Sequence, residues 1–443
     1  MDQEIRTNTL PSFRMLAVGC GIGTMLQYFN FVAYGTAAAL IFNRVFFISS
    51  SLWFSTFVSL VTLAAGFLAL PFGAILFGHF GDRISRRRML QISISMMAAT
   101  TLLVAVLPTY AAIGIAAPII LLLLRITDGV AAGGELGGAA SLLFEHAPAD
   151  KRGWYGALTL GGIGTSSFVG YGFFTLIFLL PQADMLAWGW RLPFIFGSTV
   201  GIIGIFIRRR LTEGEDFARL VREKRTLSVP VITLFRQHTA KILLTVGASL
   251  GYFSLSAILL IFILSYAPQK LGISATAVLV AALCGTAMQA VMTFFFGWFS
   301  DRIGKRRPVM LGGTIFSALA SFPVFWLLQT RNVAVLVLTV TIGSVALGSV
   351  TGPMATFFAE LFSTSLRYTG VGLATLTGSA VGLGITPLIA NRIIAATGST
   401  TGVSVYMAFV ALISVGCLLA LPETAQSKRD SLVVPARLPI AEL

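Results

Sequence analysis

Long apolar stretches recur along almost the whole chain, and they constrain its fold more than any other feature. An α-helix needs roughly 20 mostly apolar residues to cross the hydrocarbon core of a bilayer, which is about 30 Å thick. With 56% hydrophobic and 11% charged residues, the chain has too little polar surface for a soluble globule of 443 residues. We expect an all-α integral membrane protein whose transmembrane helices occupy twelve ranges: 15–41, 52–78, 88–108, 111–144, 154–180, 188–208, 241–268, 275–299, 308–328, 333–361, 366–391 and 402–422.

The basic residues are distributed very unevenly between the two ends of these helices. Of the 31 Lys and Arg residues, 25 fall in the N-terminus, the loops after even-numbered helices and the C-terminal tail, and 5 fall near the opposite face. Cytoplasmic loops carry such an excess, so both termini are expected in the cytoplasm. The net charge of +14 therefore reflects membrane topology. Acidic residues dilute the Arg-rich stretch at 208–225, so no nucleic-acid partner is expected.

Two related halves are visible in the sequence. Asp82 and Arg83 recur as Asp301 and Arg302, at an offset of 219 residues (301 − 82 = 219), and further echoes follow helices 4 and 10. Parallel repeats of this kind occur in transporters that bind substrate between their halves near the middle of the bilayer. The expected organisation is an N-terminal six-helix bundle at 1–207, a cytoplasmic linker at 208–240, a pseudo-symmetric C-terminal six-helix bundle at 241–424 and a cytoplasmic tail at 425–443.

Several motifs carry a resemblance to a known family. The segment GHFGDRISRRR at 78–88, with its copy GWFSDRIGKRR at 297–307, resembles the loop signature of the major facilitator superfamily. The segment RITDGVAAGGELGGAA at 125–140 and the segment WGWRLPF at 188–194 resemble the metabolite:proton symporters within it. Members of that family carry ketoglutarate, citrate, shikimate, proline or betaine. The resemblance implies a multi-pass protein of the bacterial inner membrane that works as a monomer.

The first helix departs from the family pattern. Family members carry two carboxylates there, whereas this chain has the amides Gln27 and Asn30 on either side of Tyr28 and Phe29. Proton coupling requires a titratable group inside the membrane, and all three histidines fall in expected cytoplasmic loops. A proton path through the first helix is therefore not expected.

Arg125, Asp128 and Glu135 are the charged residues expected within the fourth helix. Asp128 and Glu135 are seven residues apart, which places them on nearly the same helix face, and Arg125 is within pairing distance of Asp128. One interpretation is an ion pair that only holds the helix in place. The other is that Arg125 anchors an anionic substrate group while Asp128 replaces a lost carboxylate as the proton carrier. For Glu135 a proton role and a helix-packing role remain equally open.

Gln27, Tyr28 and Asn30 are the further candidates for substrate binding. Their amide and phenol groups lie close together on one helix, and buried polar groups in a membrane need partners. A substrate in the cavity could supply those partners. Neighbouring helices could equally do so.

The repeated loop signatures predict a cytoplasmic gate. Asp82 and Asp301 are expected to accept hydrogen bonds from the N-terminal ends of helices in the opposite half, while adjacent Arg residues pair with Glu145 and Glu360. Arg87, Arg88, Arg306 and Arg307 are expected mainly to set topology. The predicted gate residues are Gly78, Asp82, Arg83, Glu145, Arg152, Asp301, Arg302, Glu360 and Arg367.

The sequence thus favours a secondary transporter that moves a small organic anion or zwitterion by proton symport. A proton-independent facilitator or an exporter is the alternative, favoured by the amides of the first helix. A membrane sensor that uses the carrier fold is a third possibility from a different class. We expect no enzyme activity, since no nucleophile, base and orienting group recur together, and neither a cofactor nor a metal site.

Overall fold

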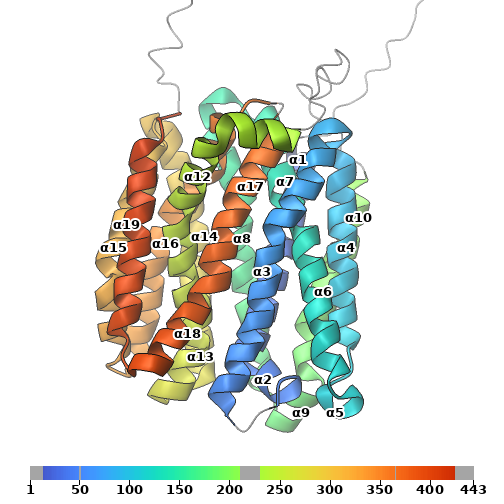
Figure 1. Cartoon of the computed structure of the whole chain (residues 1–443), viewed down its shortest axis with the longest axis vertical. Helices are drawn as coiled ribbons and strands as arrows, with labels where there is room; N and C mark the ends of the chain where they lie inside the picture. Colours follow the sequence, from blue (N-terminus) through green and yellow to red (C-terminus); the bar gives the residue numbers. More distant parts are fainter. Residues whose placement is uncertain (1–12, 49–50, 210–229, 365, 425–443) are drawn as a thin grey trace, which may run out of the picture.

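The computed structural model describes residues 13–48, 51–209, 230–364 and 366–424, and these are almost wholly helical (Figure 1). In the first half, the long helices are α1 (Phe13–Leu40), α3 (Leu52–Arg83), α4 (Arg86–Val106), α6 (Ala116–Gly133) followed by α7 (Glu135–His146), α8 (Arg152–Ile177) and α10 (Leu192–Arg208). Short helical segments connect them: α2 (Phe42–Val45), α5 (Tyr110–Ile113), η1 (Ala149–Lys151), α9 (Gln182–Ala187) and η2 (Gly189–Arg191).

The second half repeats this pattern with more irregular helices. Helix α12 (Pro230–Ala257) is kinked at His238, and from there the seventh span continues through η3 (Ile258–Phe262), α13 (Ile263–Tyr266) and η4 (Ala267–Leu271). The remaining elements are α14 (Ala275–Ile303), α15 (Arg307–Leu328), α16 (Val333–Leu361), α17 (Arg367–Ser379), η5 (Ala380–Ile385), α18 (Thr386–Thr397) and α19 (Thr401–Ala420). The segments η3, η4 and η5 are π-helical, a local widening that frequently marks functional sites.

The predicted fold of twelve transmembrane helices in two bundles is confirmed. Eleven helical segments in the described residues are long and apolar enough to cross a bilayer, and α1, which packs on α8 and α10, is the remaining one. Side chains such as Phe72, Leu319 and Trp326 point outward with large exposed fractions, as a lipid-facing surface requires. The two halves meet where α3 packs on α17 and η5, and where α8 packs on α14 and α16.

Several expected boundaries need correction. Helix α3 continues to Arg83 and α14 continues to Ile303, so the loop signatures begin inside helices rather than after them. The fourth span runs through α6 and α7, which meet at Gly134, so Asp128 belongs to α6 and Glu135 to α7 of one membrane-spanning segment. Of the expected linker at 208–240, residues 210–229 lie outside the described part, and helix α12 begins at Pro230. The expected tail at 425–443 also lies outside it.

One end of the molecule collects buried charge. Helices α3 and α14 end there, and α4, α8, α15 and α17 begin there, at the upper end in Figure 1. We call it the basic end, because Arg86, Arg208, Arg306 and Arg367 are buried at this level. Glycine residues bring the helices of the two halves together near it: a Cβ on Gly137 of α7 would lie 2.4 Å from the carbonyl oxygen of Tyr368 in α17.

Candidate functional site

A cavity lies between the two halves, lined by residues of both. We call it the central cavity. Aromatic rings form much of its wall, among them Phe31 of α1 and Phe67 of α3. None of its lining residues in the described part of the chain carries a charge. The polar lining residues are Tyr28, Ser167 and Tyr171 from the first half and Tyr252 and Ser256 from the second.

Some polar groups beside this cavity are buried without a hydrogen-bond partner. The hydroxyl of Tyr28 has none among the described residues, and neither has the side-chain oxygen of Gln289, whose amide donates to the Tyr252 hydroxyl at 3.1 Å. Gln27 is also buried, with an unpartnered oxygen, although it does not line the cavity. Buried polar groups are nearly always satisfied, so the orphaned atoms indicate where a bound polar molecule would make contacts.

A second, narrower cavity lies inside the first half and contains the predicted charged residues. We call its polar members the coupling cluster: Asn30, Thr100, Thr101, Arg125 and Asp128. Nη1 of Arg125 donates to Oδ2 of Asp128 at 2.6 Å. The other oxygen of Asp128 accepts from Thr100 at 3.1 Å and lies 3.5 Å from the amide nitrogen of Asn30. Asn30 also donates to Thr101 at 2.5 Å.

An aromatic layer separates Arg125 from the central cavity. The guanidinium carbon lies 4.1 Å from the ring centroid of Phe31 and 4.7 Å from that of Tyr34. The rings of Phe31 and Phe67 are stacked, with centroids 4.3 Å apart, and both face the cavity. Gly66 makes room for this arrangement, because a Cβ there would lie 2.4 Å from Nε of Arg125. Arg125 and Asn30, both expected to bind substrate, thus line this second cavity and not the central cavity.

The carboxylate of Glu135 is held in an ion pair. It is fully buried at the beginning of α7 and forms a two-pronged ion pair with Arg208, the last residue of α10. Arg208 also donates to the carbonyl oxygen of Leu90 at 2.9 Å. Glu135 lies about two helical turns along the span from Asp128 and pairs with α10, not with the coupling cluster. The packing interpretation of Glu135 fits this geometry better than the proton interpretation.

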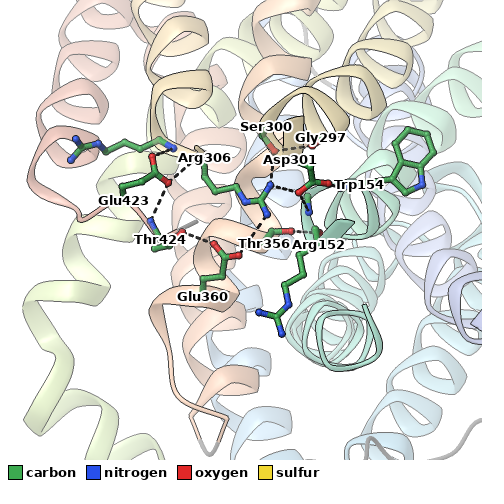
Figure 2. A network of polar contacts seen from close by, with 12 residues as sticks. Arg152, Trp154, Gly297, Ser300, Asp301, Arg306, Thr356, Glu360, Glu423 and Thr424 are labelled. Carbon is green, nitrogen blue, oxygen red and sulfur yellow. Dashed lines mark hydrogen bonds and ion pairs between the residues drawn. The ribbon is translucent and has the colours of Figure 1, made fainter. Parts of the chain in front are cut away.

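Near the basic end, Asp301 joins the two halves (Figure 2). Its carboxylate accepts hydrogen bonds from the backbone N–H groups of Gly153 at 2.8 Å and Trp154 at 2.7 Å, at the N-terminal end of α8. Arg306 donates to the same carboxylate at 2.5 Å and lies 3.7 Å from Glu360. A carboxylate is well placed at a helix N-terminus, where unpaired N–H groups give a partial positive charge.

The repeat-related network around Asp82 is built on the same plan. Its Oδ2 accepts from the backbone N–H of Thr369 at 3.0 Å and from the Thr369 hydroxyl at 2.7 Å, in the first turn of α17. Arg86 pairs with Glu145 at 2.5 Å and lies 3.3 Å from Asp82. Glu145 in turn accepts from Arg367 of the second half at 3.3 Å. Together these contacts form what we call the cross-half network.

The remaining predicted gate residues have different positions. Arg83 and Arg302 are exposed at the ends of their helices and stand outside the network. Arg152 participates through its backbone, since its carbonyl oxygen accepts from Thr356 at 2.7 Å. Gly78 lies against Thr369, where a Cβ would be 2.8 Å from the Thr369 hydroxyl.

Sequence reasoning missed several members of the network. Arg306, expected only to set topology, is buried in it, and so is Arg86. Their spacing carried a signal: Arg86 follows Asp82 by four residues and Arg306 follows Asp301 by five, so each can turn back toward its carboxylate. The sequence around Tyr368 carries no comparable spacing that would predict its role. Its hydroxyl donates to the carbonyl oxygen of Gly134, across the two halves.

Comparison with known proteins agrees with this architecture. Residues 242–443 match the family model described as Major Facilitator Superfamily, and residues 15–225 match the one described as Sugar (and other) transporter. The shikimate transporter of Escherichia coli (strain K12) is 33% identical over 430 residues, covering 96% of each chain. The chain belongs to the major facilitator superfamily. It is therefore a multi-pass transporter of small metabolites and not an enzyme.

Other members of the superfamily extend the comparison. The inner membrane metabolite transport protein YhjE of Escherichia coli (strain K12) is 33% identical and covers 96% of this chain and 97% of its own. The proline/betaine transporter of Salmonella typhimurium is 30% identical, covering 93% of this chain and 84% of its own. Among solved structures, the proton:xylose symporter XylE has the same fold, with a TM-score of 0.74 at 15% identity over 93% of this chain and 96% of its own. The metabolite-transporter relatives support the resemblance seen in the motifs.

Proposed function

We propose that this transporter carries a small polar metabolite of low net charge, a zwitterion or a hydroxylated monocarboxylate, in symport with protons. The observation that carries the proposal is the uncharged, tyrosine-lined central cavity beside a buried, separately enclosed Arg125–Asp128 pair. A multiply charged anion would be poorly matched to a wall without cations. The names of the relatives, which include shikimate and proline/betaine transporters, fit this class of substrate.

Substrate recognition would rest on the hydroxyl groups of the cavity. Tyr28 approaches from α1, Tyr171 from α8 and Tyr252 from α12, so a molecule between them touches both halves at once. The unpartnered hydroxyl of Tyr28 is available to a carboxylate or hydroxyl of the substrate. The ring faces of Phe31 and Phe67 offer apolar contact and, for a zwitterion, attraction to a cationic group.

Proton coupling would act through the coupling cluster. Protonation of Asp128 removes the charge that balances Arg125, and two further guanidinium nitrogens of Arg125, Nε and Nη2, have no hydrogen-bond partner among the described residues. Arg125 lies over Phe31, which lines the central cavity. A change in the Arg125–Asp128 ion pair would therefore reach the cavity wall through the ring of Phe31. In this proposal Arg125 acts on the cavity through the aromatic layer and not by direct contact with the substrate.

Alternating access would use contacts at both ends of the molecule. The cross-half network closes the basic end. At the opposite end, Gln269 of η4 donates to Thr56 of α3 at 3.1 Å. To open on one side, a carrier must break the contacts at that end while it keeps the contacts at the other end. We further propose that the basic end faces the cytoplasm of a bacterial inner membrane, with both termini on that side, and that a monomer is the working unit.

The test is uptake into proteoliposomes that contain the purified chain, with radiolabelled zwitterions and hydroxylated monocarboxylates offered singly. Accumulation above equilibrium that requires an inward proton gradient is the expected result. Uptake of the same solutes that only equilibrates, with or without the gradient, would support the alternative of a proton-independent facilitator. The amides at positions 27 and 30 are the observation that keeps this alternative open.

A further inference from the structure

A groove opens on the outer surface of the second half, away from the central cavity. Helices α14, α15 and α16 form its walls, and its apolar lining includes Phe299, Pro308, Phe316 and Ile342. Phe316 and Ile342 are 40% and 53% exposed, so the groove faces the lipid. It begins at Pro308, in the first turn of α15, and reaches Phe316, a distance of about 12 Å at 1.5 Å per residue. That length corresponds to most of one bilayer leaflet.

Glycine keeps the groove open. Gly312 of α15 lies on its floor and is exposed, and a Cβ built there meets no atom within 4 Å. The neighbouring Gly313 packs closely on Ser349 of α16. In the first half, the repeat-related position is Ser93 (312 − 93 = 219), which is fully buried and donates to the carbonyl oxygen of Ala131. The open floor is thus a property of the second-half position.

Two cations lie in the chain between lining residues at the basic end of this groove, three residues after Phe299 and three before Pro308. Arg302, in the last turn of α14, and Lys305, in the turn to α15, are both exposed and form no ion pair with the residues that the structure describes. The nearest carboxylates are engaged elsewhere. Asp301 accepts from the N-terminal end of α8, and Glu423 accepts from the backbone N–H groups of Arg306 and Arg307. The positive charge of Arg302 and Lys305 is therefore available to an external anion.

We propose that the groove binds one anionic phospholipid, with an acyl chain along Phe299, Gly312 and Phe316 and the headgroup phosphate at Arg302 and Lys305. Basic residues beside grooves between transmembrane helices bind acidic headgroups in this way. The indole of Trp298, 5.4 Å from the guanidinium carbon of Arg302, holds that cation at the interface. Because α14 also carries Asp301, the lipid contacts a helix of the cross-half network. The inference does not depend on the identity of the transported substrate.

The test is lipid binding to the purified full-length chain in detergent, measured by native mass spectrometry during titration with phosphatidylglycerol or with phosphatidylcholine of the same acyl chains. The wild type is expected to bind phosphatidylglycerol about thirtyfold more tightly, roughly fivefold for each of the two cations. The double variant Arg302→Gln/Lys305→Gln is expected to lose this preference. Arg83→Gln, at the exposed repeat-related position, is the charge control and is expected to keep it.

A second pair of variants tests the acyl-chain part. Gly312→Leu fills the floor of the groove and is expected to weaken binding of both lipids. Gly416→Leu makes the same change on the lipid-facing surface of α19, where a Cβ also meets nothing within 4 Å, and is expected to have no effect. Equal affinity of the wild type for the two lipids would overturn the proposal. So would a dimer that Gly312→Leu disrupts without any change in lipid binding, since the groove would then belong to a second copy of the chain.

Discussion

The hydroxyl of Tyr368, in the second half, donates a hydrogen bond to the carbonyl oxygen of Gly134, where α6 meets α7 in the first half. The ring is fully buried, and a Cβ on Gly81 or on Gly138 would lie within 3 Å of it. The repeat-related position in the first half is Gly153, by the same 215-residue offset that relates Arg152 to Arg367 (367 − 152 = 215). The second half therefore inserts the ring of Tyr368 into the first half. The first half has no ring to insert at the repeat-related position, because that residue is Gly153.

We expect Tyr368→Phe to favour opening at the basic end. The substitution keeps the ring but leaves the carbonyl oxygen of Gly134 without its donor, at a cost of about 1–2 kcal/mol to the closed state. The measurement is the labelling rate of Ser256→Cys in the central cavity, from the basic side, in a background without Cys20, Cys284 and Cys417. A several-fold faster rate is expected. Tyr110→Phe, on an exposed tyrosine, is the control, and equal rates for the two would show that the contact does not hold the end closed.

Asp301→Asn is expected to loosen the same end by a different route. The amide oxygen can still accept a hydrogen bond, but the negative charge that attracts the N-terminal end of α8 and Arg306 is gone. A loss of about 1–2 kcal/mol from the closed state is expected. The same labelling assay measures it, with Asp184→Asn on the exposed helix α9 as the matched control. Labelling that stays at the wild-type rate would mean that Asp301 serves only the packing of its own half.

Much of the fold was predictable, because hydrophobic length and the distribution of basic residues are strong local signals. The ends of α3 and α14 could not be predicted, because Asp82 and Asp301 resemble loop residues until their partners in the opposite half are known. Asp82 and Asp301 were correctly expected to meet helix N-termini, because the partial positive charge there stabilises a carboxylate. The burial of Arg306 rather than Arg302 depends on which residue of the turn faces inward, and one sequence does not reveal that.

The position of Glu135 illustrates a second limit. Seven-residue spacing correctly predicts a face shared with Asp128, since Asp128 contacts α1 and α4 and Glu135 lies against Gly23 of α1. It does not reveal which residue pairs with Glu135. Its actual partner, Arg208, lies 73 residues away at the end of α10. Long-range pairs of this kind leave no periodic trace in a single sequence.

Glu135→Gln is expected to destabilise the protein without a specific effect on proton coupling. It removes one partner of a buried ion pair, the carboxylate that Arg208 meets, and such a loss costs about 3–5 kcal/mol. The melting temperature of the purified protein should fall clearly, and Glu135→Gln/Arg208→Gln should be less destabilised than the sum of the single variants. A single variant with unchanged melting but no gradient-driven uptake would instead assign Glu135 to proton transfer.

Tyr28→Phe is expected to weaken substrate recognition while leaving stability almost unchanged. The hydroxyl has no hydrogen-bond partner among the described residues, so its removal breaks no hydrogen bond with them. If it bonds the substrate, KM should rise by roughly tenfold, the equivalent of about 1.4 kcal/mol. The readout is the concentration dependence of uptake, with Tyr110→Phe as the control. An unchanged KM would place the substrate elsewhere in the cavity.

The most direct measurement for the whole account compares uphill accumulation with counterflow for Asp128→Asn in proteoliposomes. Counterflow exchanges labelled for unlabelled substrate and needs no net proton movement. If Asp128 carries the coupled proton, the variant loses accumulation driven by the proton gradient and retains counterflow, while Asp184→Asn retains both. Full gradient-driven accumulation by Asp128→Asn would contradict the account, because the Arg125–Asp128 pair would then only hold α6 in place.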